Sequence, residues 1–270
     1  MERYFEANRR RWNELVEIHT KSGGYDVQGF LKGKNTLHSI ELDALGDVKD
    51  KKLLHLQCYF GLDTLSWARL GAKVTGVDFS DKAVELARML NEKTGLDADF
   101  INCNIYDLPK QLNKRFDVVY TSYGVLNWLN DVEEWARIAA SYLKPGGTFF
   151  IAEFHPFPWI FDDDHPSELV IKYDYWHKTE PDSYDSPDAY ASGGLKLKNT
   201  EEYGWAHPIG TVVSALINAG LTIQWLREYP FSVDQDQFKF MVKDTEGYWR
   251  LPGDPVPLMY SIKATKPRPN

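Results

Sequence analysis

The side chains best suited to hold a nucleotide-like ligand lie in two short segments, each at the end of an apolar run. The first segment, residues 57–61, reads QCYFG and follows the apolar run LLHLQ at 53–57. The second is Asp78, near the end of the run KVTGVDFS at 73–80. A carboxylate at the end of a strand can accept hydrogen bonds from both hydroxyls of a ribose. These residues therefore predict an adenosine site.

The loop at 57–61 lacks the glycine pattern that a dinucleotide requires. Dinucleotide enzymes use the pattern GxGxxG because their backbone amides must approach a pyrophosphate closely. The chain contains no such run. S-adenosylmethionine carries no phosphate, so a loop that binds it needs shape more than an anion site. The pattern thus favours S-adenosylmethionine over a nicotinamide cofactor.

Apolar runs of strand length alternate with apolar stripes at helical spacing, and this alternation must position both segments. The expected strands are residues 53–57, 73–80, a run near Ala98, a run from Phe116, and residues 148–154, 221–229 and 259–265. Parallel neighbours need a crossover, so the alternation predicts an α/β fold, doubly wound, with a mostly parallel seven-stranded sheet. No helix is expected between the last two strands, so the last strand is expected to be antiparallel.

The chain is expected to form one domain. The segments outside this alternation are expected to build the pocket for the molecule that reacts with the cofactor. We divide residues 1–270 into an N-terminal helical cap (1–49), a cofactor-binding core (50–155), a lid inserted after the fifth strand (156–205) and the C-terminal part of the sheet (206–270). Aromatic residues make up 14% of the chain, and many lie outside the core segment. This distribution indicates pocket walls as well as core.

Composition limits the partners of the protein. The formal net charge is −8, whereas nucleic-acid binders concentrate Lys and Arg on one face, so we expect a small-molecule partner and no nucleic acid. Cys58 and Cys103 are the two cysteines and show no zinc or disulfide spacing. The sequence has no run of about 18 apolar residues, so no membrane-spanning helix is expected. We expect a cytoplasmic protein without a membrane partner, and the oligomeric state stays open.

The run DDDH at 162–165 brings three carboxylates together. Clustered carboxylates suit hard cations, but this run matches no calcium-binding loop. We therefore expect a solvated loop and no metal site.

A resemblance extends over roughly residues 50–155. The segments LLHLQCYFGLDTLSWARLGAKVTGVDFSDKAVELAR, FDVVYTSYGVLNWL and LKPGGTFFIAEFHP resemble class I (Rossmann-like) S-adenosylmethionine-dependent methyltransferases of the small-molecule type. The usual first motif of that family, DLGCGTG, corresponds here to HLQCYFG. His55, Gln57 and Tyr59 stand at the positions of the acid and the first two glycines. Gln57 or Tyr59 is therefore expected to replace backbone contacts with side-chain contacts.

The resemblance implies a set of cofactor contacts. The methionine end is expected to meet Gln57, Cys58, Tyr59 and Gly61, the ribose Asp78, the adenine Phe79, Asn104 and Ile105, and the sulfonium Ser122, Tyr123 and Leu126. The resemblance also implies S-adenosylmethionine as the cofactor and methyl transfer as the reaction.

A general base is needed where the methyl acceptor is a hydroxyl or a protonated amine. His155 follows the fifth strand directly, and its ordinary pKa near 6.5 suits proton uptake, so it is the first candidate. Glu153 is expected to orient it or to fix a substrate cation. The alternative for His155 is a histidine held by its own loop. Tyr123 is the third residue expected in the catalytic group, and the residues expected to contact the acceptor are Trp12, Tyr25, Trp128, Trp205 and His207.

The expected function is methyl transfer to N or O of a small molecule, and two alternatives stay open. A nicotinamide-dependent oxidoreductase would bind NAD without affinity for S-adenosylhomocysteine. A non-catalytic S-adenosylmethionine-binding protein would keep the methyl group on the cofactor with every acceptor.

Overall fold

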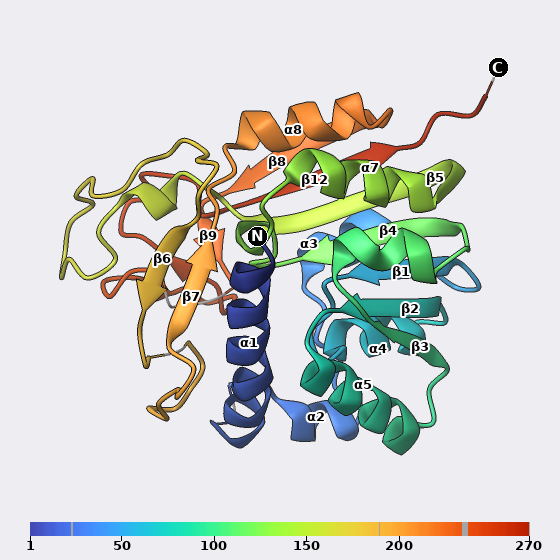
Figure 1. The fold of residues 1–270 in the computed structure, drawn as a ribbon, viewed down its shortest axis with the longest axis horizontal. Helices are drawn as coiled ribbons and strands as arrows, with labels where there is room; N and C mark the ends of the chain where they lie inside the picture. Colours follow the sequence, from blue (N-terminus) through green and yellow to red (C-terminus); the bar gives the residue numbers. More distant parts are fainter. Residues whose placement is uncertain (23, 189, 234–236, 270) are drawn as a thin grey trace.

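The computed structural model describes residues 1–22, 24–188, 190–233 and 237–269. Its centre is a seven-stranded sheet of order β3-β2-β1-β4-β5-β12-β8 (Figure 1). The strands are β1 (Lys52–Leu56), β2 (Lys73–Asp78), β3 (Ala98–Asn102), β4 (Phe116–Ser122), β5 (Leu143–Phe154), β8 (Thr222–Tyr229) and β12 (Met259–Thr265). The strands β1 to β5 pair in parallel, and β12 runs antiparallel to both β5 and β8. The predicted fold class and the antiparallel last strand are confirmed.

Helices cover both faces of this sheet because successive side chains of a strand point to opposite faces. In β5, Phe149 and Ile151 pack with α7 (Val132–Tyr142) and α8 (Ile209–Asn218), whereas Phe150 and Ala152 pack on the opposite side. That opposite side carries α3 (Ser39–Leu45) and α4 (Leu62–Arg69). Figure 1 shows α7 and α8 lying together over β5, β12 and β8. The sheet therefore has a buried core on each face.

The N-terminal segment forms α1 (Glu2–Ser22) and α2 (Val27–Leu31), which lie near the edge of the sheet beside α5 (Asp81–Thr94). Helix α1 stands between α5 and the hairpin of β6 (Asp182–Asp185) and β7 (Glu201–Gly204), as Figure 1 shows. Asn8 fixes this contact, since it donates to the carbonyl of Tyr203 at 2.8 Å and accepts from its amide at 2.9 Å. The cap and the inserted segment thus meet.

Several short elements were not predicted from the sequence. They are the helices α2 and α6 (Leu108–Gln111), the β6–β7 hairpin, and a small sheet of β9 (Phe231–Ser232), β10 (Val242–Lys243) and β11 (Trp249–Arg250). The hairpin strands read DSYD and EEYG, so they have no apolar alternation that would indicate a strand. No helix of the described ranges is long and apolar enough to cross a bilayer.

Candidate functional site

A cavity of about 1130 Å³, called the main cavity below, opens at the carboxyl ends of β1, β2 and β4 and extends under α1 and the β6–β7 hairpin. Every predicted site residue except His155 lines it: Gln57, Cys58, Tyr59, Gly61, Asp78, Phe79, Asn104, Ile105, Ser122, Tyr123, Leu126, Glu153, Trp12, Tyr25, Trp128, Trp205 and His207. Parallel strands end at one edge of a sheet, which is why loops far apart in sequence meet here.

The loop after β1 keeps a left-handed backbone at all three positions where the related motif has glycine. The φ angles are 56° at Gln57, 52° at Tyr59 and 76° at Gly61. A left-handed conformation costs a non-glycine residue roughly 1–2 kcal/mol. At Gly61 a Cβ would lie 2.7 Å from the ring of Phe100, so only glycine fits there. The loop therefore keeps its shape while carrying two large polar side chains.

Asp78 ties this loop to the end of β2. Its carboxylate is 7% exposed, and it accepts from the amides of Tyr59 at 2.8 Å and Ser80 at 2.9 Å. Burial raises the pKa of Asp78 to about 6, and the amide hydrogen bonds oppose that rise. Each carboxylate oxygen accepts more than one hydrogen bond. Both oxygens thus keep capacity for a diol.

Asn104 and Ile105 border the main cavity directly after β3. The Asn104 side chain accepts from the amide of Tyr106 at 3.1 Å, which leaves its NH₂ group as a donor. Ile105 is buried and offers an apolar surface. One polar and one apolar group side by side suit the edge and the face of a planar base.

Glu153 organises the loop after β4. The carboxylate is 4% exposed and accepts from the backbone amides of Gly124, Val125, Leu126 and Phe154. Burial raises the pKa of Glu153, and the four amides oppose that rise. The hydrogen bonds of Glu153 among the described residues go to these amides and not to His155. These contacts do not support the expectation that Glu153 orients His155, and they show that the carboxylate anchors the loop after β4.

His155 lies outside the lining of the main cavity. Its Nδ1 accepts from the amide of Phe157 at 3.1 Å, and its Nε2 lies 3.0 Å from Oε1 of Glu228. Burial lowers the pKa of His155, although the Glu228 carboxylate opposes this. This placement does not support His155 as the general base and matches the alternative of a histidine held by its own loop.

Replacing His155 by alanine is therefore expected to lower the free energy of unfolding by about 1–3 kcal/mol, because a buried ring is removed and the amide of Phe157 loses its acceptor. Urea unfolding measures the change. The control Glu228→Gln keeps the His155 ring and should cost less. A His155→Ala protein of unchanged stability but lost turnover would contradict this interpretation.

Tyr123 faces the main cavity with a buried carboxylate behind it. Its hydroxyl donates to Oε2 of Glu41 at 2.6 Å, and Oε1 of Glu41 accepts from the amide of His38 at 2.9 Å. Glu41 is 0% exposed, and burial, with the nearby charge of Asp63, raises its pKa to about 8. Burial and Glu41 hold the pKa of the Tyr123 hydroxyl well above its usual range. The pair can pass a proton away from the cavity.

The sequence did not reveal Glu41 as a site residue. It reads as an ordinary first-turn acid of a short helix, 82 residues before Tyr123. Only the packing of α3 against β5 brings it under the loop after β4. The pattern of the sequence contains no signal that could have found it.

Aromatic side chains from the cap, the core and the inserted segment form one wall of the main cavity. The Trp12 ring lies 5.0 Å from that of Tyr59 and 5.3 Å from that of Trp128, and the Tyr25 hydroxyl is 2.8 Å from that of Tyr190. The structure therefore brings the predicted residues Trp12, Tyr25 and Trp128 together across 116 positions of sequence. Such a wall excludes water from a reacting group.

Trp205 and His207 close the far side of the main cavity. The indole of Trp205 is buried and donates to the carbonyl of Thr179 at 3.4 Å. His207 Nε2 lies 2.7 Å from the carbonyl oxygen of Leu129, and burial lowers the pKa of His207 to about 4. His207 is thus neutral and serves as part of the wall.

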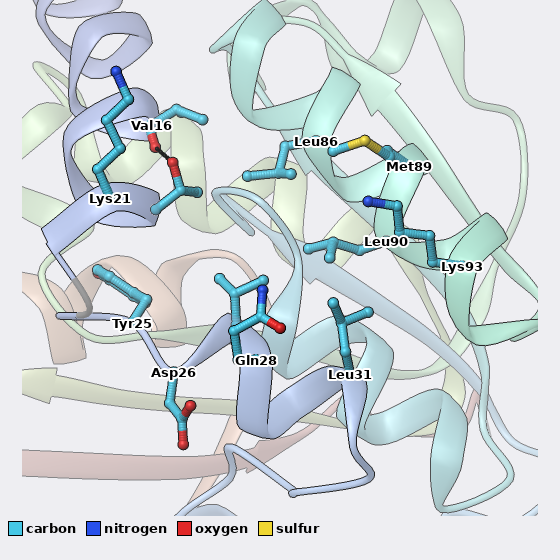
Figure 2. A pocket seen from close by; sticks show the side chains of 12 residues that line it. Val16, Lys21, Tyr25, Asp26, Gln28, Leu31, Leu86, Met89, Leu90 and Lys93 are labelled. Carbon is cyan, nitrogen blue, oxygen red and sulfur yellow. Dashed lines mark hydrogen bonds between the residues drawn. The ribbon is translucent and has the colours of Figure 1, made fainter.

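A second hollow, of about 530 Å³, lies between α1, α2 and α5. Figure 2 shows Leu86, Met89 and Leu90 of α5 facing Leu31 of α2 across it. Of the predicted site residues, Tyr25 alone borders it. The hollow is separate from the strand ends, so we assign it no role in the site.

The run of three acids lies outside the strand ends as well. Ligand oxygens of Asp162, Asp163 and Asp164 lie within 4.8 Å of one another. Asp162 pairs with Lys172 at 2.9 Å and Asp164 with Lys239 at 2.8 Å. These lysines compensate the charge that a cation would otherwise balance.

The sequence is similar to those of known methyltransferases. The profile of a family described as a methyltransferase domain matches residues 54–151. A ubiquinone biosynthesis O-methyltransferase of Saccharophagus degradans is 28% identical over 82% of this chain and 85% of its own length. The corresponding protein of Proteus mirabilis is 30% identical over 47% of this chain. The chain spans 54%, 61% and 58% of the lengths of three such relatives.

Solved structures show the same fold. A crystal structure described as a putative S-adenosylmethionine-dependent methyltransferase of Listeria monocytogenes has a TM-score of 0.58 at 19% identity and covers 84% of this chain and 96% of its own. An S-adenosylmethionine-dependent methyltransferase of Mesorhizobium loti has a TM-score of 0.58 at 20% identity and covers 87% of this chain and 99% of its own.

Proposed function

We propose that the protein is a class I S-adenosylmethionine-dependent methyltransferase that transfers the methyl group of S-adenosylmethionine to an oxygen of a small molecule, and the methyltransferase-domain profile at residues 54–151 and the likeness to O-methyltransferases support this. The observation that carries the proposal is Asp78, a buried carboxylate at the end of β2 that faces the main cavity beside the left-handed loop. An acid at this point suits the ribose of an adenosine.

The residues present fit the cofactor. Asp78 would hold the ribose, and Phe79, Asn104 and Ile105 would enclose the adenine. Gln57, Cys58, Tyr59 and Gly61 would line the methionine end, and Ser122 and Leu126 would lie beneath the sulfur. One observation supports this fit in particular: Gln57 Oε1 is buried without a hydrogen-bond partner among the described residues. When bound, the cofactor supplies a methyl group already activated by a positive sulfur.

The proposed acceptor is a hydroxyl group on a planar, uncharged or cationic molecule. The aromatic wall suits a flat ring, and the O-methyltransferase names of the relatives agree with an oxygen nucleophile. The Tyr123 hydroxyl would accept the proton of the acceptor and pass its own proton to the Glu41 carboxylate. The remaining acceleration would come from orientation, because holding the methyl donor and the acceptor in line lowers the activation barrier by about 7–11 kcal/mol.

Calorimetry with S-adenosylhomocysteine, followed by a labelled-methyl screen of phenols and other hydroxyl compounds, tests the function. Binding in the first experiment and transfer in the second are expected. Binding of NAD without S-adenosylhomocysteine would point to an oxidoreductase. Binding of S-adenosylhomocysteine with a label that stays on the cofactor throughout would point to a non-catalytic protein.

Replacing Asp78 by alanine is expected to weaken the binding of S-adenosylhomocysteine about 10- to 100-fold, because a charge-assisted hydrogen bond is worth about 1.5–3 kcal/mol. Calorimetry measures the affinity, and thermal unfolding without ligand shows whether the variant is folded. The control is Asp97→Ala, which removes an exposed acid before β3. An unchanged dissociation constant in a folded Asp78→Ala protein would refute the ribose role.

We further propose that the protein acts in the cytoplasm on a small molecule and has no nucleic-acid partner. The net charge of −8 and two cysteines that are both buried free thiols support this placement.

A further inference from the structure

Buried polar atoms without a hydrogen-bond partner mark two sides of the main cavity. Among the described residues that line it, these atoms are Nε1 of Trp12, Oε1 of Gln57, Nδ1 of His207, and both Nε2 and Oε1 of Gln237. Trp12 and Gln57 lie at the β1 loop, on the cofactor side. His207 and Gln237 take no part in the proposed cofactor contacts. Because buried polar groups are nearly always paired in folded proteins, these two residues point to a second ligand.

The ring of His207 is held so that its Nδ1 can only accept a hydrogen bond. Its Nε2 lies 2.7 Å from the carbonyl oxygen of Leu129, and since a carbonyl oxygen only accepts, Nε2 carries the proton. Burial lowers the pKa of His207 to about 4, so the ring is neutral near pH 7 and Nδ1 keeps its lone pair. The ring of His177 stacks on His207 at 5.1 Å. Stacking covers a face of the ring, whereas the lone pair lies in the ring plane.

His207 and Gln237 lie on the same side of the main cavity and are linked through Tyr175. The Tyr175 hydroxyl accepts from the amide of Ile209, two residues after His207, at 3.3 Å. The Tyr175 ring packs against the apolar cluster that contains Phe238, the neighbour of Gln237. That cluster also includes residues of the segment after β5, and His207 contacts the loop after β4. This side therefore lies at β4 and β5, away from the adenosine residues at β2 and β3.

The cationic side chains that line the main cavity are engaged. Among the described residues they are Arg11 and Lys34. Nε of Arg11 lies 2.8 Å from a carboxylate oxygen of Glu202, and Lys34 pairs with Asp26 at 3.0 Å. Burial lowers the pKa of each histidine in the same lining, His38, His55 and His207. A carboxylate bound beside His207 would thus lack a charged partner, and an uncharged ligand group fits better.

The free atoms of His207 and Gln237 define the group that would satisfy them. Nδ1 of His207 and Oε1 of Gln237 accept, and Nε2 of Gln237 donates. Their complement is an uncharged group with two N–H donors beside one acceptor. A primary carboxamide has this composition, whereas an ester offers no donor and a carboxylate is both charged and without donors.

We infer that His207 and Gln237 bind a carboxamide group of the methyl acceptor. One N–H of that group donates to His207 Nδ1, the other donates to Gln237 Oε1, and the carboxamide oxygen accepts from Gln237 Nε2. This inference rests on the proposed function and narrows its acceptor to a hydroxylated planar ring that carries an uncharged carboxamide. It makes Gln237, which the sequence did not single out, a specificity-determining residue.

Binding of matched ring compounds to the complex with S-adenosylhomocysteine tests the inference by calorimetry. The compounds are 3- and 4-hydroxybenzamide, the corresponding methyl hydroxybenzoates, which keep the carbonyl and lack the N–H groups, and the hydroxybenzoate anions. The better amide is expected to bind about 10-fold more tightly than its ester, the value of one hydrogen bond to a buried group that otherwise stays unpaired. The hydroxybenzoates should bind most weakly.

Two variants test the individual contacts. Gln237→Leu is expected to erase the difference between amide and ester, and Gln237→Met replaces it should the leucine variant unfold. His207→Gln keeps a donor for the Leu129 carbonyl and removes the acceptor at the Nδ1 position. It should weaken the amide about 10-fold and leave the ester within about threefold. His207→Asn, whose shorter side chain can place an oxygen near that position, should restore part of the affinity.

The controls separate this inference from its premise. Gln224→Leu replaces an exposed glutamine of β8 outside the lining of the main cavity and should leave every affinity unchanged. Each variant should bind S-adenosylhomocysteine within about threefold of the unaltered protein. Equal binding of amide and ester, an amide preference that survives in Gln237→Leu, or no binding of any ring compound would overturn the inference alone. Failure of the unaltered protein to bind S-adenosylhomocysteine would overturn the proposed function with it.

Discussion

Replacing Tyr123 by phenylalanine is expected to lower kcat about 100-fold or more with an acceptor found in the methyl screen, because proton transfer by a placed group typically contributes about 10²- to 10⁴-fold. The affinity for S-adenosylhomocysteine should change little, since Tyr123 donates to Glu41 and the backbone of the loop is held by Glu153. Single-turnover rates and calorimetry measure the two quantities. A kcat within a factor of three of the unaltered enzyme would remove Tyr123 from the reaction.

The same pair sets an expected pH profile. Glu41 must be a carboxylate to take the proton, and burial raises its pKa to about 8, so kcat should rise with pH and level off above about 8. The charged and titratable groups that face Glu41 are Asp63 of α4 and Tyr120 and Tyr123 of β4 and its loop. The two tyrosines stay protonated in that range because burial raises their pKa values.

Glu41→Gln should flatten this profile, and it has a second readout in stability. The pKa of Glu41 is higher in the folded protein than the ordinary value of 4.5. The folded state therefore binds the extra proton, and stability from Glu41 is present at low pH and lost as pH rises through about 8. Between about pH 4.5 and pH 8, the free energy of unfolding should therefore fall less in Glu41→Gln than in the unaltered protein. An equal pH dependence of stability in both proteins would show that Glu41 ionises normally.

Replacing Glu153 by alanine is expected to lower the free energy of unfolding by about 3–5 kcal/mol, since several buried amides lose their acceptor at about 1–3 kcal/mol each. Glu153→Gln should cost nearly as much, because its NH₂ group would face two amide donors, either those of Gly124 and Phe154 or those of Val125 and Leu126. Urea unfolding measures both changes.

A matched control is available on β8, which β12 separates from β5 in the sheet. Glu228 carries the same carboxylate with its side chain 52% exposed, so Glu228→Ala should change stability by about 1 kcal/mol at most. A loss below 1 kcal/mol in Glu153→Ala would mean that water replaces the carboxylate at the loop after β4.

The sheet could be predicted from the sequence because its signals are local. The alternation of residues 53–57 and 73–80 with helical stripes indicates parallel strands, and the missing helix before 259–265 indicates the antiparallel return. The small sheet of β9, β10 and β11 could not be predicted, since two-residue strands have no periodicity.

The cofactor side of the candidate site was also predictable in position. Residues at the ends of parallel strands meet at one edge whatever the loops do, so Asp78, Asn104 and Ser122 had to converge. The same reasoning did not place His155, which lies outside the lining of the main cavity. It follows β5 directly, yet its ring turns to Phe157 and Glu228 instead of the main cavity. The position of a residue at the end of a strand determines where its backbone lies. The packing around it determines where its side chain points.

The sequence by itself determined the fold class, the edge of the sheet that carries the site and the acid at the end of β2, because these depend on periodicity and strand order. The tertiary structure decided which polar groups are buried and who their partners are. Glu41 lies behind Tyr123, Glu153 is occupied by loop amides, and Trp12 stands beside the β1 loop. Such contacts join segments up to 82 residues apart, and a local pattern carries no information about them.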